Sequence, residues 1–461
     1  MPTNDVIACE NTSHSSTASS ELVRALTCKF EQELCKVVAS IGCEEFTPPS
    51  FAGALSGLRA MLDGIGRDAL LGLLKERDVA SPSIDVDGRC ARFRESSERE
   101  WLTAFGKIPV PRRAYRGDGP SAPSAVPLDQ ACGMTDRFMT PDVEEMVATS
   151  MAMLAANETA LLLSKMLPEG PSATAIQNAV RRLGVEIDEQ REEIEQTIES
   201  DAPLSRDGDT LVVSWDGVMA PLRGTPKVTW REASVATVSI YGQTADGPEK
   251  LDTRYLARMP EKGMKTLLEQ VVDQVTRAKR NRVFREFGIV CDGKDTIWDA
   301  AAAHPELHEA VWILDFYHAA ENLMKAAKAI HGDDEVAAQR WHQKIRRRLR
   351  DEPNGADSAI RAMRRLKQKL QPNSKRSKVV KNAINYFCLH RTRMCYPDFV
   401  AMGLPIGSGN VESAAKNIVQ ARLKRSGMRW SIDGGQHVLD LRTYLKSGRW
   451  EYMWGVLKTA A

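Results

Sequence analysis

Between residues 211 and 315, three apolar segments are each followed directly by an aspartate, and this feature limits the possible folds most. The aspartates are Asp216, Asp292 and Asp315, and glycine follows the first two. Short apolar runs are typical of buried strands, and open α/β sheets bind ligands outside the carboxyl ends of their strands. We therefore expect the three acids at one edge of a sheet. Asp-Gly is also a common way to leave a strand, so a single such site would indicate only a turn.

The segments around these acids alternate between strand and helix patterns. Strands are predicted over residues 211–215, 228–242, 253–258, 287–291 and 310–314, and helices over residues 264–282, 296–303 and 319–330. A β hairpin or meander followed by strand–helix–strand–helix gives a mixed sheet with helices on its faces. The predicted fold class is therefore α/β.

The chain has 461 residues, which predicts two or three domains. Residues 1–20 are rich in Ser and Thr and are expected to form a disordered tail. We expect a helical and small β region at 21–130, a helical domain at 141–200, the first part of the sheet domain at 208–330, a basic α-helical insertion at 331–403, and terminal helices at 404–461. Helices interrupted by a Gly-bearing turn within 141–200 fit a helix-turn-helix, although many helical domains have this pattern.

A fourth acid follows a glycine-rich loop. Glu412 lies in the first turn of a helix predicted from Asn410, whose side chain is a suitable cap. An acid at this position also compensates the helix dipole, which is the alternative explanation. Carboxylates gathered at one place are the ligands that Mg²⁺ prefers, and two such ions support phosphodiester chemistry.

Composition limits the compartment and the partners. The nine cysteines form no CxxC pair, which predicts a reducing cytoplasm, and no segment is apolar enough to predict a membrane span. The net charge is only +2, but basic residues concentrate between Arg340 and Lys381. A solvated helix face is the alternative reading of that basic run.

Several motifs together resemble bacterial insertion-sequence transposases of the ISKra type, which are related to Mutator-like elements. They are Ser214-Trp-Asp-Gly-Val, Val290-Cys-Asp-Gly, Ile313-Leu-Asp-Phe-Tyr-His-Ala-Ala-Glu-Asn-Leu, Gly407-Ser-Gly-Asn-Val-Glu-Ser-Ala-Ala-Lys, Arg422-Leu-Lys-Arg-Ser-Gly-Met-Arg-Trp and Ser447-Gly-Arg-Trp. The resemblance extends from about Trp101 to the C-terminus. It implies an RNase H-like fold with an α-helical insertion before the last catalytic helix.

The resemblance also implies roles for particular residues. Asp216, Asp292 and Glu412 resemble the catalytic DDE carboxylates that hold two Mg²⁺ ions, for which Mn²⁺ can substitute. Asp315 and His318 resemble an accessory active-site motif. Asp315 remains an alternative to Asp292 as the second ligand, and His318 is alternatively a core histidine at a helix start.

Beside such a site, basic residues are expected to bind DNA, because Arg and Lys neutralise DNA phosphates. The predicted DNA-binding residues are Arg346, Arg347, Arg348, Arg422, Lys424, Arg425, Arg429 and Trp430. Trp430 is alternatively part of the core. Either the helices at 141–200 or the basic insertion could read the element ends.

One departure from the family concerns the paired cysteines of a small zinc-ribbon-like region. Only Cys90 stands near that place, so no zinc is expected there. Cys388, His390 and Cys395 lack a standard finger spacing, and we interpret these two cysteines as core residues.

The resemblance thus implies a DNA transposase that hydrolyses a phosphodiester at its terminal inverted repeats and transfers the strand to target DNA. Its expected partners are double-stranded DNA, at element ends and target, and further copies of itself in a dimer or larger assembly. We expect a cytoplasmic, nucleoid-associated protein without membrane attachment. The alternatives are a catalytically inactive, domesticated DNA-binding protein and a metal-dependent, structure-selective nuclease.

Overall fold

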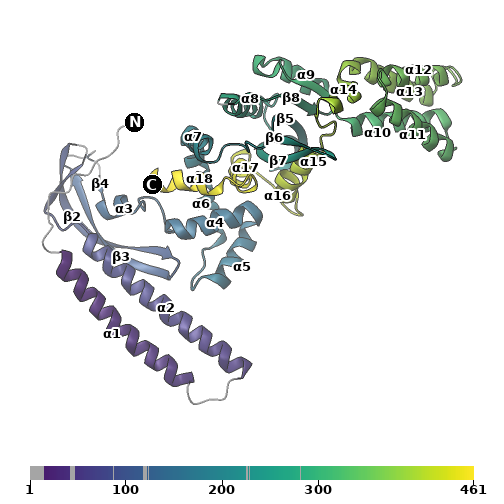
Figure 1. Ribbon diagram of the computed structural model, residues 1–461. Helices are drawn as coiled ribbons and strands as arrows, with labels where there is room; N and C mark the ends of the chain where they lie inside the picture. Colours follow the sequence, from purple (N-terminus) through teal and green to yellow (C-terminus); the bar gives the residue numbers. More distant parts are fainter. Residues whose placement is uncertain are drawn as a thin grey trace. The chain divides into compact units, whose positions relative to one another are not determined.

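The computed structural model describes residues 15–41, 47–86, 88–117, 122, 124–224, 227, 229–280 and 282–460. The chain forms two compact units, one of residues 1–183 with 457–461 and one of residues 184–456. Figure 1 shows their helices and strands, and each unit is described by itself.

The first unit begins with two long helices that pack on each other, α1 (Ser15–Ile41) and α2 (Pro48–Arg77). Thr47 caps α2 by accepting the backbone N–H of Ser50, and the Ser50 hydroxyl accepts that of Thr47 in return. Residues 1–14 of the expected tail lie outside the described residues. Residues 15–20 belong to α1, so that helix begins earlier than predicted.

The small β region expected within 21–130 is a four-stranded antiparallel sheet. Its strands follow each other in chain order and are β1 (Ser83–Val86), β2 (Arg89–Thr103), β3 (Gly106–Gly117) and β4 (Ser124–Ala125). The side chains of Trp101, Ile108 and Val110 are buried with Leu128, on the short helix α3 (Pro127–Ala131). This sheet therefore has its own small hydrophobic core.

The helical region expected at 141–200 contains α4 (Pro141–Met153), α5 (Ala156–Met166), α6 (Ala173–Glu189) and α7 (Arg191–Asp201). The fully buried Glu144 of α4 forms ion pairs with Arg137 (2.6 Å) and with Arg182. A buried carboxylate needs such partners because burial disfavours its charged form. This region is helical as expected, and its DNA-binding role remains a prediction.

The second unit contains the predicted mixed sheet. The strands are β5 (Thr210–Leu222), β6 (Thr229–Thr244), β7 (Gly247–Arg258), β8 (Glu286–Cys291) and β9 (Val311–Leu314), in the spatial order β7-β6-β5-β8-β9. The first three strands form an antiparallel meander, while β8 pairs parallel to β5 and β9 parallel to β8. The connecting helices are α8 (Lys265–Arg280), α9 (Asp295–Ala302) and α10 (Phe316–His331).

Strand β5 is longer than predicted, and this changes the position of Asp216. We expected the strand to end at Trp215, but it continues to Leu222 because residues 216–222 pair with β6. Its parallel partner β8 pairs only with Thr210–Val213. Asp216 therefore lies inside a strand, just beyond the point where β8 stops covering its edge.

The predicted helical insertion consists of α11 (Glu335–Asp351), α12 (Gly355–Lys367), α13 (Lys375–Leu389), a 3₁₀ turn (Arg391–Met394) and α14 (Tyr396–Ala401). Asp334 and Ser374 cap α11 and α13 by accepting backbone N–H groups at 2.9 and 3.1 Å. Buried residues such as Leu349, Met363 and Phe387 continue the core that begins at the sheet. Figure 1 shows these helices grouped together on one side of that sheet.

The end of the chain is helical, with α15 (Gly409–Ala414), a π-helical turn (Ala415–Gln420), α16 (Ala421–Leu423), α17 (Ile432–Lys446) and α18 (Trp450–Ala460). Val411, Ala414 and Ile418 pack against Val218 and Ala220 of β5. This packing explains why β5 extends past Asp216. Among the described helices, none is long and apolar enough to span a membrane.

Candidate functional site

The predicted catalytic residues converge on the imidazole of His318, in the first turn of α10. Its Nδ1 lies 2.9 Å from Oδ1 of Asp292, the first residue after β8. Its Nε2 lies 3.9 Å from Oε1 of Glu412, in the first turn of α15. The ring therefore lies between two predicted carboxylate ligands, and all three side chains are partly exposed to solvent.

Asp216 belongs to the same electrostatic cluster. Burial raises the pKa of its carboxyl above the usual value, and the nearby negative charge of Asp292 adds to the rise. The Gly217 backbone N–H, donated to Asp216 at 2.7 Å, and the charge of Lys294 oppose this shift. The structure thus brings Asp216, Asp292 and Glu412 together around His318.

The pair formed by Asp292 and His318 is ionised over a wide pH range. Burial alone would raise the pKa of Asp292, but His318, the Gly293 N–H and Lys294 together hold it below its usual value. Asp292 in turn raises the pKa of His318 to about 9. At neutral pH the ring is therefore protonated and carries a positive charge between the carboxylates.

Asp315 occupies a different environment from the other acids. It is fully buried, and its two oxygens accept the backbone N–H groups of His318 (2.7 Å) and Ser408. It thereby caps α10 and ties the glycine loop to the end of β9. Asp315 positions the segments that carry His318 and Glu412.

Asn410 is not the cap of the helix that carries Glu412, contrary to our expectation. The helix begins at Gly409, with Ser408 in the cap position. The Asn410 amide instead donates to Ser239 Oγ of β6 (2.7 Å), and its oxygen accepts from Lys250 of β7 (3.0 Å). Asn410 lies in the first turn of α15, and its side chain faces strands β6 and β7. Its two hydrogen bonds therefore attach the start of α15 to the sheet.

The sequence reasoning missed Lys294 and Glu232. Lys294 follows Asp292 by two residues, and its Nζ lies 3.0 Å from Glu232 Oε1 on β6. Its positive charge lowers the pKa of both Asp216 and Asp292. The Asp-Gly-Lys sequence could have indicated Lys294, whereas Glu232 becomes a neighbour only through the pairing of β5 with β6.

The candidate metal ligands lie close together, but their side chains are not arranged as a metal-binding site. Within the described ranges, no group of three or more His, Cys, Asp or Glu side chains is arranged to hold a metal ion.

The prediction that Cys388 and Cys395 are core residues is wrong, because both are exposed. His390 is buried and its Nε2 lies 3.1 Å from the Gly293 carbonyl oxygen.

The predicted DNA-binding residues fall into two places. Arg346, Arg347 and Arg348 lie on α11, and Arg347 is exposed. The others are on and after α16, where Lys424, Arg425 and Arg429 are exposed and Trp430 is half-buried. Trp430 donates its indole N–H to the Leu423 carbonyl (3.1 Å), and its backbone bonds to both Pro221 and Arg223.

Arg422, which we predicted to contact DNA, has a buried side chain in this structure. Arg422 is only 1% exposed. Its guanidinium carbon lies 5.0 Å from the centre of the Trp430 ring, and its Nη1 lies 3.8 Å from the Met428 sulfur. Arg422 therefore supports the loop that carries Arg425 and Arg429, because the turn after α16 folds back over its side chain.

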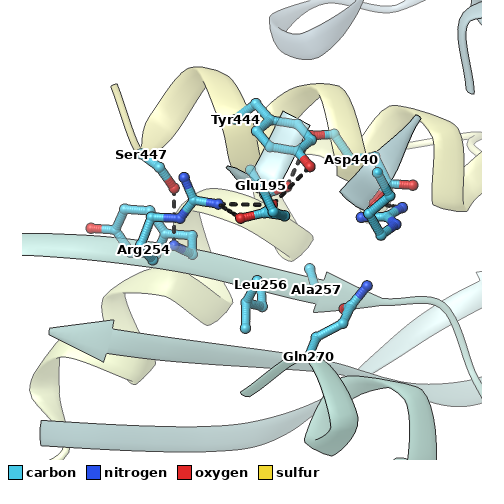
Figure 2. Close-up of a pocket in the computed structure, with 11 residues that line it drawn as sticks. Glu195, Arg254, Leu256, Ala257, Gln270, Asp440, Tyr444 and Ser447 are labelled. Atoms are coloured by element: carbon cyan, nitrogen blue, oxygen red, sulfur yellow. Dashed lines mark hydrogen bonds and ion pairs between the residues drawn. The ribbon is translucent and has the colours of Figure 1, made fainter. Parts of the chain in front are cut away.

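A buried polar network lies where α7 and α17 meet strand β7 (Figure 2). Glu195 of α7 accepts from Arg254 (2.8 and 3.0 Å) and from the Tyr444 hydroxyl (3.0 Å). It also accepts from Gln274 of α8 (2.8 Å). The cavity here is about 10 Å³, space for no more than a water molecule. This pocket is a structural junction between α7, α17 and the sheet, and it cannot hold a substrate.

Comparison with known protein families found no family model that matches this chain. No curated protein matches it either. The functional interpretation therefore depends on the residues and on the geometry described above.

Proposed function

We propose that this protein is a DNA transposase of the DDE class, with an RNase H-like core. The observation that carries the proposal is the convergence of Asp292 and Glu412 on His318, at 2.9 and 3.9 Å, with Asp216 in the same electrostatic cluster. Asp216 lies on the first strand of the sheet, Asp292 directly follows the fourth, and Glu412 follows a helical insertion. These are the positions that the family resemblance assigns to the three carboxylates.

The side chains also fit a Mg²⁺ site in their chemistry. Carboxylate oxygens are the ligands that Mg²⁺ prefers, and Asp216, Asp292 and Glu412 supply them. The negative charge of Asp292 raises the pKa of Asp216, so this place concentrates negative charge that a cation would stabilise. Without metal, the protonated His318 ring supplies that positive charge. Asp315 has both oxygens bound to backbone N–H groups, which favours Asp292 as the second ligand.

The bound ions would activate the attacking hydroxyl and stabilise the leaving oxygen of a phosphodiester. The residues of the chain contribute orientation and charge. Asp315 fixes the first turn of α10 and the glycine loop, so His318 and Glu412 face each other. Lys294 places a positive charge beside Asp216 and Asp292. In-line displacement needs no covalent protein intermediate, so no Ser or Tyr nucleophile is required.

DNA at the element ends and at the target is the proposed substrate, and joining of two ends favours a dimer or larger assembly. The insertion helices α11, α12 and α13 expose many Arg and Lys side chains on the outside of a shared apolar core. Such a surface neutralises phosphates and makes binding strongly dependent on salt. Lys424, Arg425 and Arg429 offer a second basic surface after α16.

The test is Mg²⁺-dependent cleavage and joining of a labelled DNA fragment that carries the element's own end. Asp292→Asn and Glu412→Gln should each abolish both steps, because each removes a carboxylate charge at the site. Mn²⁺ should support the same reactions. The matched control is Glu232→Gln, which changes a nearby acid that pairs with Lys294 and is not a proposed ligand.

A catalytically inactive DNA-binding protein is the second candidate. The observation that favours it is the position of the His318 ring between Asp292 and Glu412, where Asp292 raises the pKa of the ring to about 9 and so favours a positive charge without any metal. Tight binding of the element end without cleavage, by a protein of verified fold, would support this candidate. Cleavage without joining would instead indicate a metal-dependent nuclease.

A further inference from the structure

A pocket of about 330 Å³ lies against the first turn of α10, outside the carboxylate cluster. Its lining residues are Phe316, Gln343, Arg346, Arg347 and Arg350. The last four lie on α11 at spacings of three, four and seven residues, which places them on one face of that helix. The pocket is therefore built by one face of α11 and the aromatic ring that begins α10.

The charge of this pocket is strongly positive and incompletely neutralised. Arg350 pairs with Asp351 at 2.6 Å. In the part of the chain that the structure describes, no ion pair joins Arg346 or Arg347 to an acid; the Arg346 guanidinium carbon instead lies 4.9 Å from the centre of the Phe316 ring. Converging guanidinium groups repel each other, so an anion bound between them would be stabilised.

Arg348 differs from these three arginines although it was predicted with two of them. It does not line the pocket, and its Nε lies 3.6 Å from Glu352 one turn further along α11. At helical spacing, Arg348 lies on a different face of α11 from Gln343, whereas Arg350 lies on the same face as Gln343. Of the arginines in the longer basic run, Arg346, Arg347 and Arg350 line the pocket.

The position of the pocket relates it to the carboxylate cluster. Phe316 directly follows Asp315 and precedes His318 by two residues, which is about 3 Å along the axis of α10. The Phe316 backbone N–H donates to the Ile406 carbonyl (2.9 Å), in the loop that leads to Glu412. The same helical turn therefore forms a wall of the arginine pocket and carries His318 of the proposed active site.

We propose that the arginine pocket binds a backbone phosphate of the DNA substrate, next to the phosphodiester that reacts at the carboxylates. The guanidinium fork matches two oxygens of one phosphate, which a point charge does not. The volume admits a phosphate with part of its sugar. This inference rests on the proposed function, because it takes the reacting strand to pass the first turn of α10.

The test uses the full-length protein and DNA with single methylphosphonate linkages, which remove the charge of one phosphate at a time. Binding is measured by fluorescence anisotropy in EDTA, so that no cleavage is needed. For the wild type, one position near the reacting end should weaken binding by roughly tenfold. In Arg347→Gln that position should have no further effect, because the same contact is already lost.

Salt dependence gives a second measurement. Arg347→Gln should reduce the slope of log affinity against log salt by about 0.9, the value for one phosphate contact. Lys344→Gln is the matched control, since Lys344 is exposed on the same helix but does not line the pocket, and it should leave the methylphosphonate profile unchanged. Arg347→Lys should keep most of the slope yet weaken binding, because the charge remains and the fork is lost.

The outcomes separate this inference from the proposed function. If wild-type protein binds and joins DNA but Arg347→Gln keeps both the slope and the methylphosphonate profile, the pocket inference is wrong and the transposase proposal survives. If the protein binds DNA with the expected profile but never cleaves it, the pocket inference survives and the transposase proposal fails. Absence of any DNA binding would overturn both.

Discussion

The imidazole Nδ1 of His318 lies 2.9 Å from the carboxylate Oδ1 of Asp292, so an ion pair joins the first turn of α10 to the end of β8. A second link between these segments is the backbone N–H of Asp315, which donates to the Cys291 carbonyl (2.9 Å). The ion pair also keeps a positive charge among Asp216, Asp292 and Glu412. In the metal-free protein this histidine balances the carboxylates, so its protonation should respond both to pH and to a bound cation.

His318→Gln should destabilise the metal-free protein in a pH-dependent way. The folded state raises the pKa of His318 from 6.5 to about 9. The pair's contribution is therefore complete below pH 6.5 and is lost as the pH rises through about 9. We expect a loss of about 1–2 kcal/mol at pH 6, discounted for partial exposure, and much less at pH 10. Urea denaturation at both pH values measures it, and an equal loss at both would contradict the ion pair.

Bound Mg²⁺ should lower the pKa of His318. A divalent cation at the carboxylates disfavours the protonated ring, which Asp292 stabilises in the metal-free protein. NMR titration of the histidine ring, with and without Mg²⁺, measures the shift. The control is Glu412→Gln, in which Mg²⁺ should have a smaller effect. An unchanged pKa at saturating Mg²⁺ would argue that the ion does not bind beside Asp292.

Asp315→Ala should destabilise the fold more than Asp292→Ala. Asp315 is fully buried and accepts the N–H groups of His318 and Ser408, and its removal leaves two donors without a partner. We expect a loss of about 2–4 kcal/mol, compared with about 1 kcal/mol for the partly exposed Asp292. Denaturant midpoints of the two variants give the comparison. A milder effect for Asp315→Ala would mean that these backbone groups find water or other acceptors.

Glu195→Ala should be among the most destabilising single changes in the second unit. Arg254 is 3% exposed, and Figure 2 shows Glu195 between it and Tyr444. Removing the carboxylate leaves a buried unpaired guanidinium, at a cost of about 3–5 kcal/mol. Glu192→Ala, on the same helix, is the control, because its side chain is 69% exposed and should cost less than about 1 kcal/mol. Similar midpoints for both variants would show that Arg254 is satisfied elsewhere.

The sequence was sufficient to predict the order of strands and helices from β5 to α10. Short apolar runs between helical patterns are a local signal, and each of the predicted strands is present. The end of β5 was not predictable, because residues 216–222 are held in the strand by pairing with β6 and by packing under α15. Neither contact can be read from the residues of the strand itself.

The three strand-end aspartates looked alike in the sequence, and only tertiary contacts distinguish them. Asp315 differs because the loop before α15 returns to it and donates the Ser408 N–H. Arg422 was similarly ambiguous. A basic residue in a basic segment predicts a surface position, but the fold places Trp430 over its guanidinium group. In both cases a charged side chain is buried by a segment whose approach the local pattern does not encode.

Arg422→Ala and Arg429→Gln should therefore affect different properties. Arg422 is 1% exposed beneath Trp430, so its loss removes packing and should cost about 2–3 kcal/mol of stability. Arg429 is exposed, so its replacement should leave stability nearly unchanged and lower the salt slope of DNA binding by about 0.9. Denaturation and anisotropy measurements on both variants test this. A normal denaturation midpoint for Arg422→Ala with a reduced salt slope would mean that its side chain reaches DNA after a rearrangement of the loop. A lower denaturation midpoint for Arg429→Gln with an unchanged salt slope would mean that the charge of Arg429 stabilises this loop and that the DNA contacts lie elsewhere.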